Sequence, residues 1–187
     1  MSRWEPDARG RLEQAALDLF SERGFDQTTA AQIAERAGLT ERTFFRHYTD
    51  KREVLFGQAH GLSQAVIETF TAIPETVAPI DAVDSTLEAI ADRFFDYERA
   101  RRRYAVIMAN TELRERELIK MACLSADLAD ALRRRGVAEP AASLAAEAGI
   151  TVYKVGFQRW MAGTGDRTLA EFFREALDEL KAVTAGG

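Results

Sequence analysis

The sequence predicts an all-α protein of about nine helices, and three observations support this. Glycine and proline are scarce, with 12 and 4 in 187 residues, so few positions interrupt regular structure. Alternating runs of β-branched residues are absent. Apolar residues recur instead every three or four positions, which is the spacing that places them on one face of a helix.

This periodicity, with the residues that start and stop helices, predicts where each helix lies. Long helices are expected at about residues 6–23, 50–73, 82–100, 101–110, 112–135, 140–162 and 168–183. Two short helices are expected between residues 28 and 51, and a linker at residues 75–79. Pro140 suits the first turn of its helix, and Thr168 can cap the last helix.

The segment from Thr28 to Lys51 is the most informative part of the chain. Thr29 is placed to cap the first short helix, and Gly38 ends it, since glycine adopts a left-handed conformation at little cost. Thr40 is placed to cap a second helix that begins at Glu41. Two helices joined by a short turn that contains glycine form a helix-turn-helix.

The second short helix carries side chains suited to DNA. Its predicted exposed residues are Arg42, Thr43, Arg46 and His47, while Phe44 and Tyr48 are predicted to face inward. Arginine forms paired hydrogen bonds with guanine, and threonine contacts a thymine methyl group or a phosphate. We therefore expect Arg42 to read bases, with Thr43 and Arg46 beside it.

The overall charge does not by itself indicate a nucleic-acid-binding protein. The formal net charge is −5, from 25 basic and 30 acidic residues. Basic residues are concentrated locally. Residues 42–52 contain four of them, Arg42, Arg46, Lys51 and Arg52, and one acidic residue, Asp50. A focused positive patch of this kind is compatible with an acidic protein.

Several features predict a protein of the cytoplasm. The single cysteine, Cys123, excludes an internal disulfide framework and fits a reducing compartment, where we expect a small buried residue rather than a redox sensor. No apolar run is long enough to span a membrane, and the first residues do not resemble a signal peptide. We expect no cofactor and no metal, because His47 and His60 lack a second ligand at helical spacing.

Residues 9–55 resemble the DNA-binding motif of the TetR family of bacterial transcriptional regulators. The resemblance is carried by ALDLFSERGFDQTT, IAERAGLTERTFFRHY and the following DK. It implies a helix-turn-helix DNA-binding domain at residues 6–55 and a helical effector-binding and dimerisation domain at residues 56–187. It further implies a homodimer that represses from a palindromic operator and is released by a small effector, although activation stays open.

The resemblance also assigns contacts within the motif. Matching positions in the family contact the DNA backbone, which implies phosphate or sugar contacts for Thr29, Thr40, Thr43, His47, Tyr48 and Lys51. The sequence departs from the family at Phe45, where tyrosine is common, and at Tyr48, where phenylalanine is common. Phe45 lacks a hydroxyl donor, so we expect it to make only apolar contact with DNA. The expected DNA-binding residues are Thr29, Thr40, Arg42, Thr43, Phe45, Arg46, His47, Tyr48 and Lys51.

The helix predicted at residues 140–162 is apolar over most of its circumference, so it should be buried on more than one side. The family dimerises through its last two long helices, which implies an interface on this helix and the next. Candidate interface residues are Leu144, Ala148, Phe157, Leu169, Phe173, Leu177 and Leu180. The alternative is that all of these residues belong to the chain's own core.

The predicted body also contains large aromatic and methionine side chains that suit an adaptable apolar pocket. Candidate pocket residues are Phe94, Phe95, Tyr104, Met108, Met121, Phe157, Trp160 and Met161. The alternative for each is an ordinary place in the core. Because buried charge is not concentrated there, the expected effector is apolar or amphipathic.

Two other classes of protein fit the sequence less well than a regulator does. A small helical enzyme needs a convergent set of titratable groups, and the sequence suggests none. A protein–protein adaptor would share the apolar C-terminal helices but has no need for Arg42, Arg46 and Lys51 in this register. The basic run at Arg99 and residues 101–103 is expected to be a solvated face or to pair with Glu112, Glu115 and Glu117.

Overall fold

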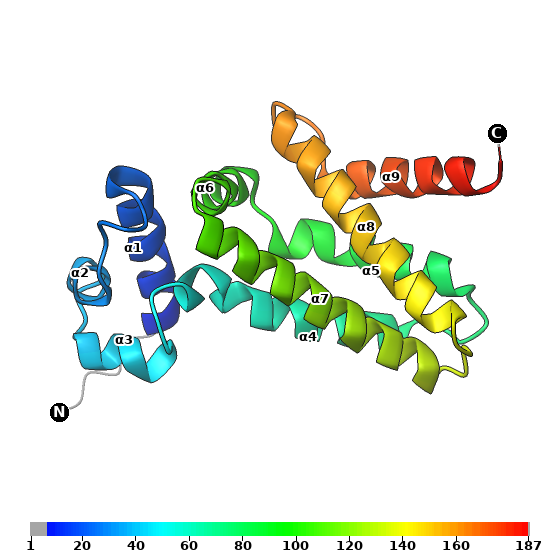
Figure 1. Cartoon of the computed structure of the whole chain (residues 1–187), viewed down its shortest axis with the longest axis horizontal. Helices are drawn as coiled ribbons and strands as arrows, with labels where there is room; N and C mark the ends of the chain where they lie inside the picture. The colour runs from blue at the N-terminus through cyan, green and yellow to red at the C-terminus, as the bar shows by residue number, and fades with distance from the viewer. Residues whose placement is uncertain (1–6, 187) are drawn as a thin grey trace. The chain divides into compact units, whose positions relative to one another are not determined.

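A computed structural model describes residues 7–186, without the side chains of residues 58–60 and 92. Within these residues the chain forms nine α-helices, one 3-10 turn and no strand (Figure 1). The elements are α1 Ala8–Arg23, α2 Ala30–Arg36, α3 Glu41–His47, η1 Glu53–Phe56, α4 Gly57–Ala72, α5 Pro79–Phe94, α6 Tyr97–Met108, α7 Thr111–Arg134, α8 Ala141–Ala162 and α9 Leu169–Thr184. The all-α prediction is confirmed. None of the described helices combines the length and apolarity needed to cross a membrane.

The predicted caps of the two short helices are present. Thr29 accepts a hydrogen bond from the backbone N–H of Gln32, whose side chain accepts from Thr29 in return. Thr40 accepts from the backbone N–H of Thr43. Between the helices Gly38 has a φ of 67°, a left-handed conformation that glycine adopts without strain. These local interactions explain why α2 and α3 form where the sequence predicts them.

The boundary expected at residues 100 and 101 is wrong. The chain breaks instead at Phe95, whose φ of −120° and ψ of 115° are extended. The carboxylate of Asp96 then accepts a hydrogen bond 2.8 Å long from the backbone N–H of Arg99, which caps the start of α6. Ala100 therefore lies inside α6, and α5 begins earlier than expected, with Pro79 in its first turn.

The long helix expected at residues 50–73 is divided in the structure. The carboxylate of Asp50 accepts hydrogen bonds from the backbone N–H groups of Arg52 and Glu53, at 2.7 and 3.3 Å. This turn leads into η1, and α4 begins only at Gly57. At the C-terminal end, Thr168 caps α9 as expected, while Pro140 precedes α8 and lies outside its first turn.

The chain divides into two compact units that are not contiguous in sequence. One, which we call the head unit, joins the described residues up to Gly61 with Arg101–Glu115. The other, the body unit, joins Leu62–Ala100 with the residues from Arg116 onward. The predicted boundary at residue 55, between a DNA-binding domain and an effector-binding and dimerisation domain, stays a prediction.

The core of the head unit uses residues from both of its segments. Buried side chains of α1, α2 and α3, among them Leu12, Ile33 and Phe44, are fully excluded from solvent. Ile107 and Leu113, which follow more than 40 residues after η1, belong to the same apolar cluster and are just as deeply buried. Residues 101–115 therefore complete the core of the helix-turn-helix.

In the body unit, α8 packs against α5 and α9. Gly156 allows close approach of α8 and α9, because a Cβ at this position would lie only 2.6 Å from the Phe173 ring. An aromatic cluster surrounds this contact, in which Tyr153 and Phe157 stack with centroids 5.7 Å apart and Phe95 meets Trp160 edge-on. Such aromatic pairs add to the free energy gained by burying apolar area.

A buried polar network joins three elements of the head unit. The Tyr48 hydroxyl donates a hydrogen bond to Oε1 of Glu13, a carboxylate that is only 7% exposed, at 2.9 Å. Arg9 donates from Nε to the Tyr48 hydroxyl at 3.3 Å and from Nη2 to the Gly57 carbonyl at 2.8 Å. Burial and the charge of Glu13 raise the pKa of Tyr48, so its hydroxyl keeps its proton.

Tyr48→Phe should lower the free energy of unfolding by about 1–2 kcal/mol, because it removes a buried hydrogen bond to a charged carboxylate. Denaturant unfolding followed by circular dichroism measures this change. Tyr97→Phe is the matched control, since the Tyr97 hydroxyl donates to the Gly163 carbonyl at an exposed position. Its cost should stay within about 0.5 kcal/mol. Equal losses in the two variants would contradict the role given to the network.

Candidate nucleic-acid interface

Helix α3 is anchored by one fully buried residue. Phe44 is 0% exposed and lies in the core of the head unit. Its ring meets that of Phe45 edge-on at 5.4 Å and that of Tyr48 at 5.6 Å. A helix of only seven residues is not stable alone, so this anchor and the Thr40 cap fix its position.

The opposite face of α3 is open to solvent. Its exposed residues are Glu41, Arg42, Phe45, Arg46 and His47, and Thr43 is half-buried. Among the large apolar side chains Phe45 is unusually open, with 52% of its surface exposed. The predicted exposure is found for Arg42, Arg46 and His47, whereas Thr43, which was also expected to be exposed, is half-buried.

The two arginines of α3 have no hydrogen bond or ion pair with any residue that the structure describes. Nearby cations are engaged. Arg11 donates from Nε to the Ala37 carbonyl at 3.0 Å, and Arg52 pairs with Asp50 at 2.8 Å. Arg42 and Arg46 thus present free guanidinium groups, which suit guanine edges and phosphates.

The three threonines assigned to DNA also shape the motif. The hydroxyls of Thr29 and Thr40 accept hydrogen bonds from helix N–H groups, and the hydroxyl of Thr43 lies 3.0 Å from that of Thr40. Thr29 and Thr40 are exposed, so their caps do not bury them. These positions leave the predicted backbone contacts geometrically possible.

Tyr48 lies differently from the expectation of a DNA contact. Only 4% of its surface is exposed, and its hydroxyl is committed to Glu13. The structure therefore gives Tyr48 a role inside the head unit. The sequence offered no local signal for this bond, because its partners are 35 residues apart.

Lys51 also has an internal role that the sequence did not reveal. Its Nζ donates to the carbonyls of Phe25 and Thr28, at 2.8 and 3.0 Å, and lies 4.1 Å from the centre of the Phe25 ring. An ammonium has three donors, so one is left beyond these two bonds. Lys51 fixes the loop between α1 and α2, whether or not it also contacts phosphate.

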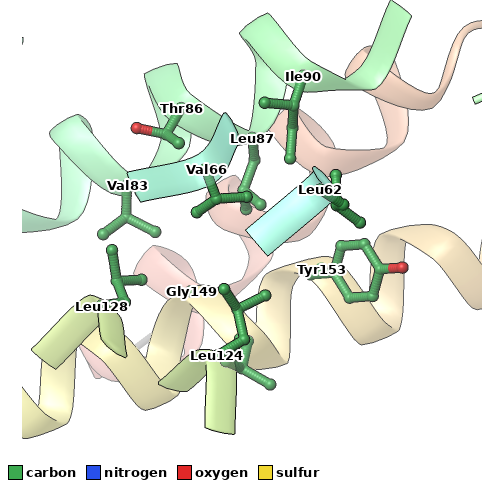
Figure 2. A pocket seen from close by; sticks show the side chains of 11 residues that line it. Leu62, Val66, Val83, Thr86, Leu87, Ile90, Leu124, Leu128, Gly149 and Tyr153 are labelled. Atoms are coloured by element: carbon green, nitrogen blue, oxygen red, sulfur yellow. The ribbon is translucent and has the colours of Figure 1, made fainter. Parts of the chain in front are cut away.

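The body unit contains a small cavity that the predicted pocket residues do not line. Figure 2 shows its walls, which come from α4, α5, α7 and α8. They consist of Leu62, Val66, Val83, Thr86, Leu87, Ile90, Leu124, Leu128, Gly149, Ile150 and Tyr153. The Thr86 hydroxyl donates to the Ala82 carbonyl at 2.8 Å, so it is already satisfied. The cavity volume is about 20 Å³, room for about one water molecule.

The residues expected to line a pocket lie elsewhere. Phe95, Phe157 and Trp160 pack in the aromatic cluster, while Tyr104 and Met108 belong to the head unit. Phe94, Met121 and Met161 are half-buried outside the cavity wall. Of the expected aromatics, Phe157 and Trp160 are buried in the core, while Phe94, Phe95 and Tyr104 are half-buried. The cavity is lined mostly by smaller aliphatic side chains, which the sequence does not distinguish from ordinary core.

The expected dimer interface needs a similar correction. Leu169, Phe173 and Leu177 are between 0% and 3% exposed within one chain, and Phe157 is 8% exposed. These side chains pack between α8, α9 and their neighbours, so little of their surface is left to contact a partner chain. Leu144 is 66% exposed, while Ala148 and Leu180 are half-buried.

Sequence reasoning missed Val155 as an interface candidate. It is 42% exposed and lies eleven residues after Leu144, which is three helical turns along the same face of α8. Leu144, Ala148 and Val155 form a stripe that we call the α8 outer stripe. The spacing in the sequence contained this signal, but it could not separate the outer face of α8 from the inner one.

Other expectations about isolated residues have mixed outcomes. Cys123 is exposed, so its predicted burial is wrong; α7 turns Leu124 and Leu128 inward instead. Arg102 pairs with Asp18 at 2.6 Å, and not with the glutamates expected. The side chain of His60 lies outside the described residues. Within the described residues no group of three or more potential ligands could hold a metal ion.

The N-terminal segment matches a known family. The profile described as "Bacterial regulatory proteins, tetR family" matches residues 13–57. The HTH-type transcriptional regulator TcmR of Streptomyces glaucescens is 33% identical over 108 residues, which make up 58% of this chain and 48% of that protein. The chain thus spans about half the length of the curated relatives it matches.

Two solved regulators share the fold along nearly the whole chain. SmeT, the repressor of the Stenotrophomonas maltophilia efflux pump SmeDEF, is 20% identical with a TM-score of 0.60, covering 94% of this chain and 89% of its own. The Thermus thermophilus repressor FadR, solved with lauroyl-CoA, is 26% identical with a TM-score of 0.53, covering 91% of each chain. With the helix-turn-helix geometry, these findings show that residues 13–57 match the DNA-binding segment of the tetR family of bacterial regulatory proteins, and that nearly the whole chain shares the fold of the two solved regulators.

Proposed function

We propose that this chain is a transcriptional regulator that binds a palindromic DNA operator as a homodimer. The observation that carries the proposal is the pair of free guanidinium groups on the exposed face of α3, Arg42 and Arg46. Helix α3 is anchored behind them by Phe44, so the two cations are presented from a fixed support. A rigid helix with arginines on its outer face suits the major groove of DNA.

In the proposed complex, two copies of α3 occupy successive major grooves ~34–36 Å apart. Residues 6–55 supply the DNA contacts, and residues 56–187 supply the dimer contacts and the effector site. Arg42 and Arg46 read bases, while Thr29, Thr40, Thr43, His47 and the remaining donor of Lys51 contact the backbone. We expect this binding to take place in the bacterial cytoplasm, with the protein on the nucleoid when bound.

We further propose that the regulator is a repressor, as SmeT and FadR are described to be. An effector that binds one arrangement of the dimer better than the other shifts the population and releases DNA. Most of the residues that line the cavity are aliphatic, which favours an apolar or amphipathic effector. At about 20 Å³ the cavity holds no such molecule in this state, so binding must open it.

The α8 outer stripe is the proposed centre of the dimer contact. Leu144 and Val155 are the large apolar residues of α8 that are exposed, and Ala148 lies between them in the sequence. Val183, which is 78% exposed near the end of α9, adds a further apolar side chain. Pairing such faces from two chains would remove this surface from water.

Replacing either α3 arginine should weaken specific DNA binding. We expect Arg42→Ala and Arg46→Ala each to cost about 1–3 kcal/mol at a selected operator, because each removes a paired hydrogen bond to a base. Operator selection from random oligonucleotides followed by fluorescence anisotropy measures the affinity. Arg134→Ala, an exposed arginine near the end of α7, is the matched control and should bind as the parent does. Unchanged affinity in both α3 variants would refute the proposed interface.

Charged residues in the α8 outer stripe should separate the dimer. Leu144→Glu with Val155→Glu is expected to give monomers, since two carboxylates would be buried in an apolar contact. Analytical ultracentrifugation measures the mass. Ile119→Glu is the control, because Ile119 is 52% exposed on α7, outside this stripe. A dimer that persists in the double variant would place the interface elsewhere.

Filling the cavity should block the effector without touching the DNA surface. Leu87→Phe is expected to weaken binding of lauroyl-CoA by about tenfold or more, equivalent to about 1.4 kcal/mol, while operator affinity stays within about twofold. Isothermal titration calorimetry measures the first quantity and anisotropy the second. CoA without its acyl chain is the control ligand, and Leu118→Phe, at an exposed position on α7, is the control protein. If lauroyl-CoA binds neither the parent nor the variants, an effector of this class is excluded.

A further inference from the structure

Phe45 is an apolar side chain placed where the proposed interface is otherwise polar. Its side chain is 52% exposed. Among the described residues of α1, α2 and α3, no other large apolar side chain is exposed. Its exposure is not explained by packing, since its neighbour Phe44 fills the core behind it. An exposed ring among cations on a recognition helix is a candidate for contact with an apolar group of DNA.

The Phe45 ring is held in a defined orientation. It meets the Phe44 ring edge-on, with centroids 5.4 Å apart and an angle of 82° between the planes. Because Phe44 is fully buried, this contact limits the positions that the Phe45 ring can take. A ring fixed in this way loses little conformational entropy on binding.

Phe45 also lies beside the proposed base-reading residues. Arg42 precedes it by three residues, so the two side chains are neighbours on the surface of α3, and Arg46 follows it directly. If Arg42 reaches a base edge, the Phe45 ring lies almost one helical turn further along α3, beside an adjacent base pair.

The chemistry of the ring limits what it recognises. Phenylalanine has no hydrogen-bond donor or acceptor and no charge, so it cannot read guanine, cytosine or adenine through their polar edges and cannot pair with phosphate. In the major groove the C5-methyl group of thymine is the apolar feature that distinguishes one base from the others.

We propose that Phe45 is a specificity-determining residue that recognises the methyl group of a thymine in each operator half-site. The proposal rests on the proposed function, because it requires α3 to lie in a major groove. It assigns the thymine to a position next to the base contacted by Arg42 or Arg46. The ring then contributes to sequence choice through burial of one methyl group, with no hydrogen bond.

Deoxyuridine tests the proposal directly, because it keeps the base pairing of thymine and lacks only the methyl group. Each thymine of the selected operator is replaced in turn, and affinities are measured by fluorescence anisotropy at one salt concentration. For the parent protein we expect a loss of about 3- to 5-fold at one thymine per half-site, the worth of one buried methyl group. For Phe45→Ala the same replacement should change the affinity by less than about 1.5-fold.

Two further proteins sharpen the result. Phe45→Leu keeps an apolar side chain and should retain part of the sensitivity to the methyl group, whereas Leu118→Ala, at an exposed apolar position of the body unit, should retain all of it. Circular dichroism shows whether the variants keep the helical content of the parent. Equal losses for the parent and Phe45→Ala at every thymine would overturn the assignment to Phe45.

The two levels of the proposal fail in distinguishable ways. If the parent binds its operator and Arg42→Ala weakens it, but no deoxyuridine replacement matters, the proposed function stands and only the role of Phe45 is lost. If the parent selects no duplex at all, the proposed function fails and the role of Phe45 with it.

Discussion

The fixed position of α3 depends on what its inner face contacts. Phe44 is fully buried in the core of the head unit, and Tyr48 closes the helix with a hydrogen bond to the buried carboxylate of Glu13. One contact is apolar and tolerates rotation, while the other is directional and specifies an angle. Together they determine which side chains of a seven-residue helix face solvent. Because α3 is held in this way, the unpaired guanidinium groups of Arg42 and Arg46 are presented to solvent from a fixed position.

Two sets of cations in the head unit differ in their partners. Arg9, Arg11 and Lys51 donate to backbone carbonyls, and in doing so they hold loops and helix ends in place. Arg42 and Arg46 have no such partner among the described residues. A count of basic residues treats both kinds alike. The acidic overall charge is therefore a poor guide to this protein, since α3 carries two cations without an internal partner on its exposed face.

The sequence predicted local structure well and long-range contacts poorly. The caps at Thr29, Thr40 and Thr168 depend on residues three positions apart, so their chemistry can be read from the chain itself. Asp96 offered the same kind of signal, but the apolar spacing around Ala100 favoured a different boundary. The engagement of Tyr48 with Glu13 and of Lys51 with Phe25 depends on tertiary packing, which periodicity does not encode. For the same reason, periodicity marked α8 and α9 as apolar but did not separate the faces that pack within the chain from Leu144 and Val155, which stay open.

The contribution of residues 101–115 to the head unit has a consequence for biosynthesis. Ile107 and Leu113 are as deeply buried as the side chains of α1 and α3 around them. A ribosome adds about 5–20 residues each second, so several seconds separate the emergence of η1 from that of Leu113. During this interval the nascent helix-turn-helix lacks part of its apolar support. The growing chain thus completes the unit that carries α3 only after Leu113 has been translated.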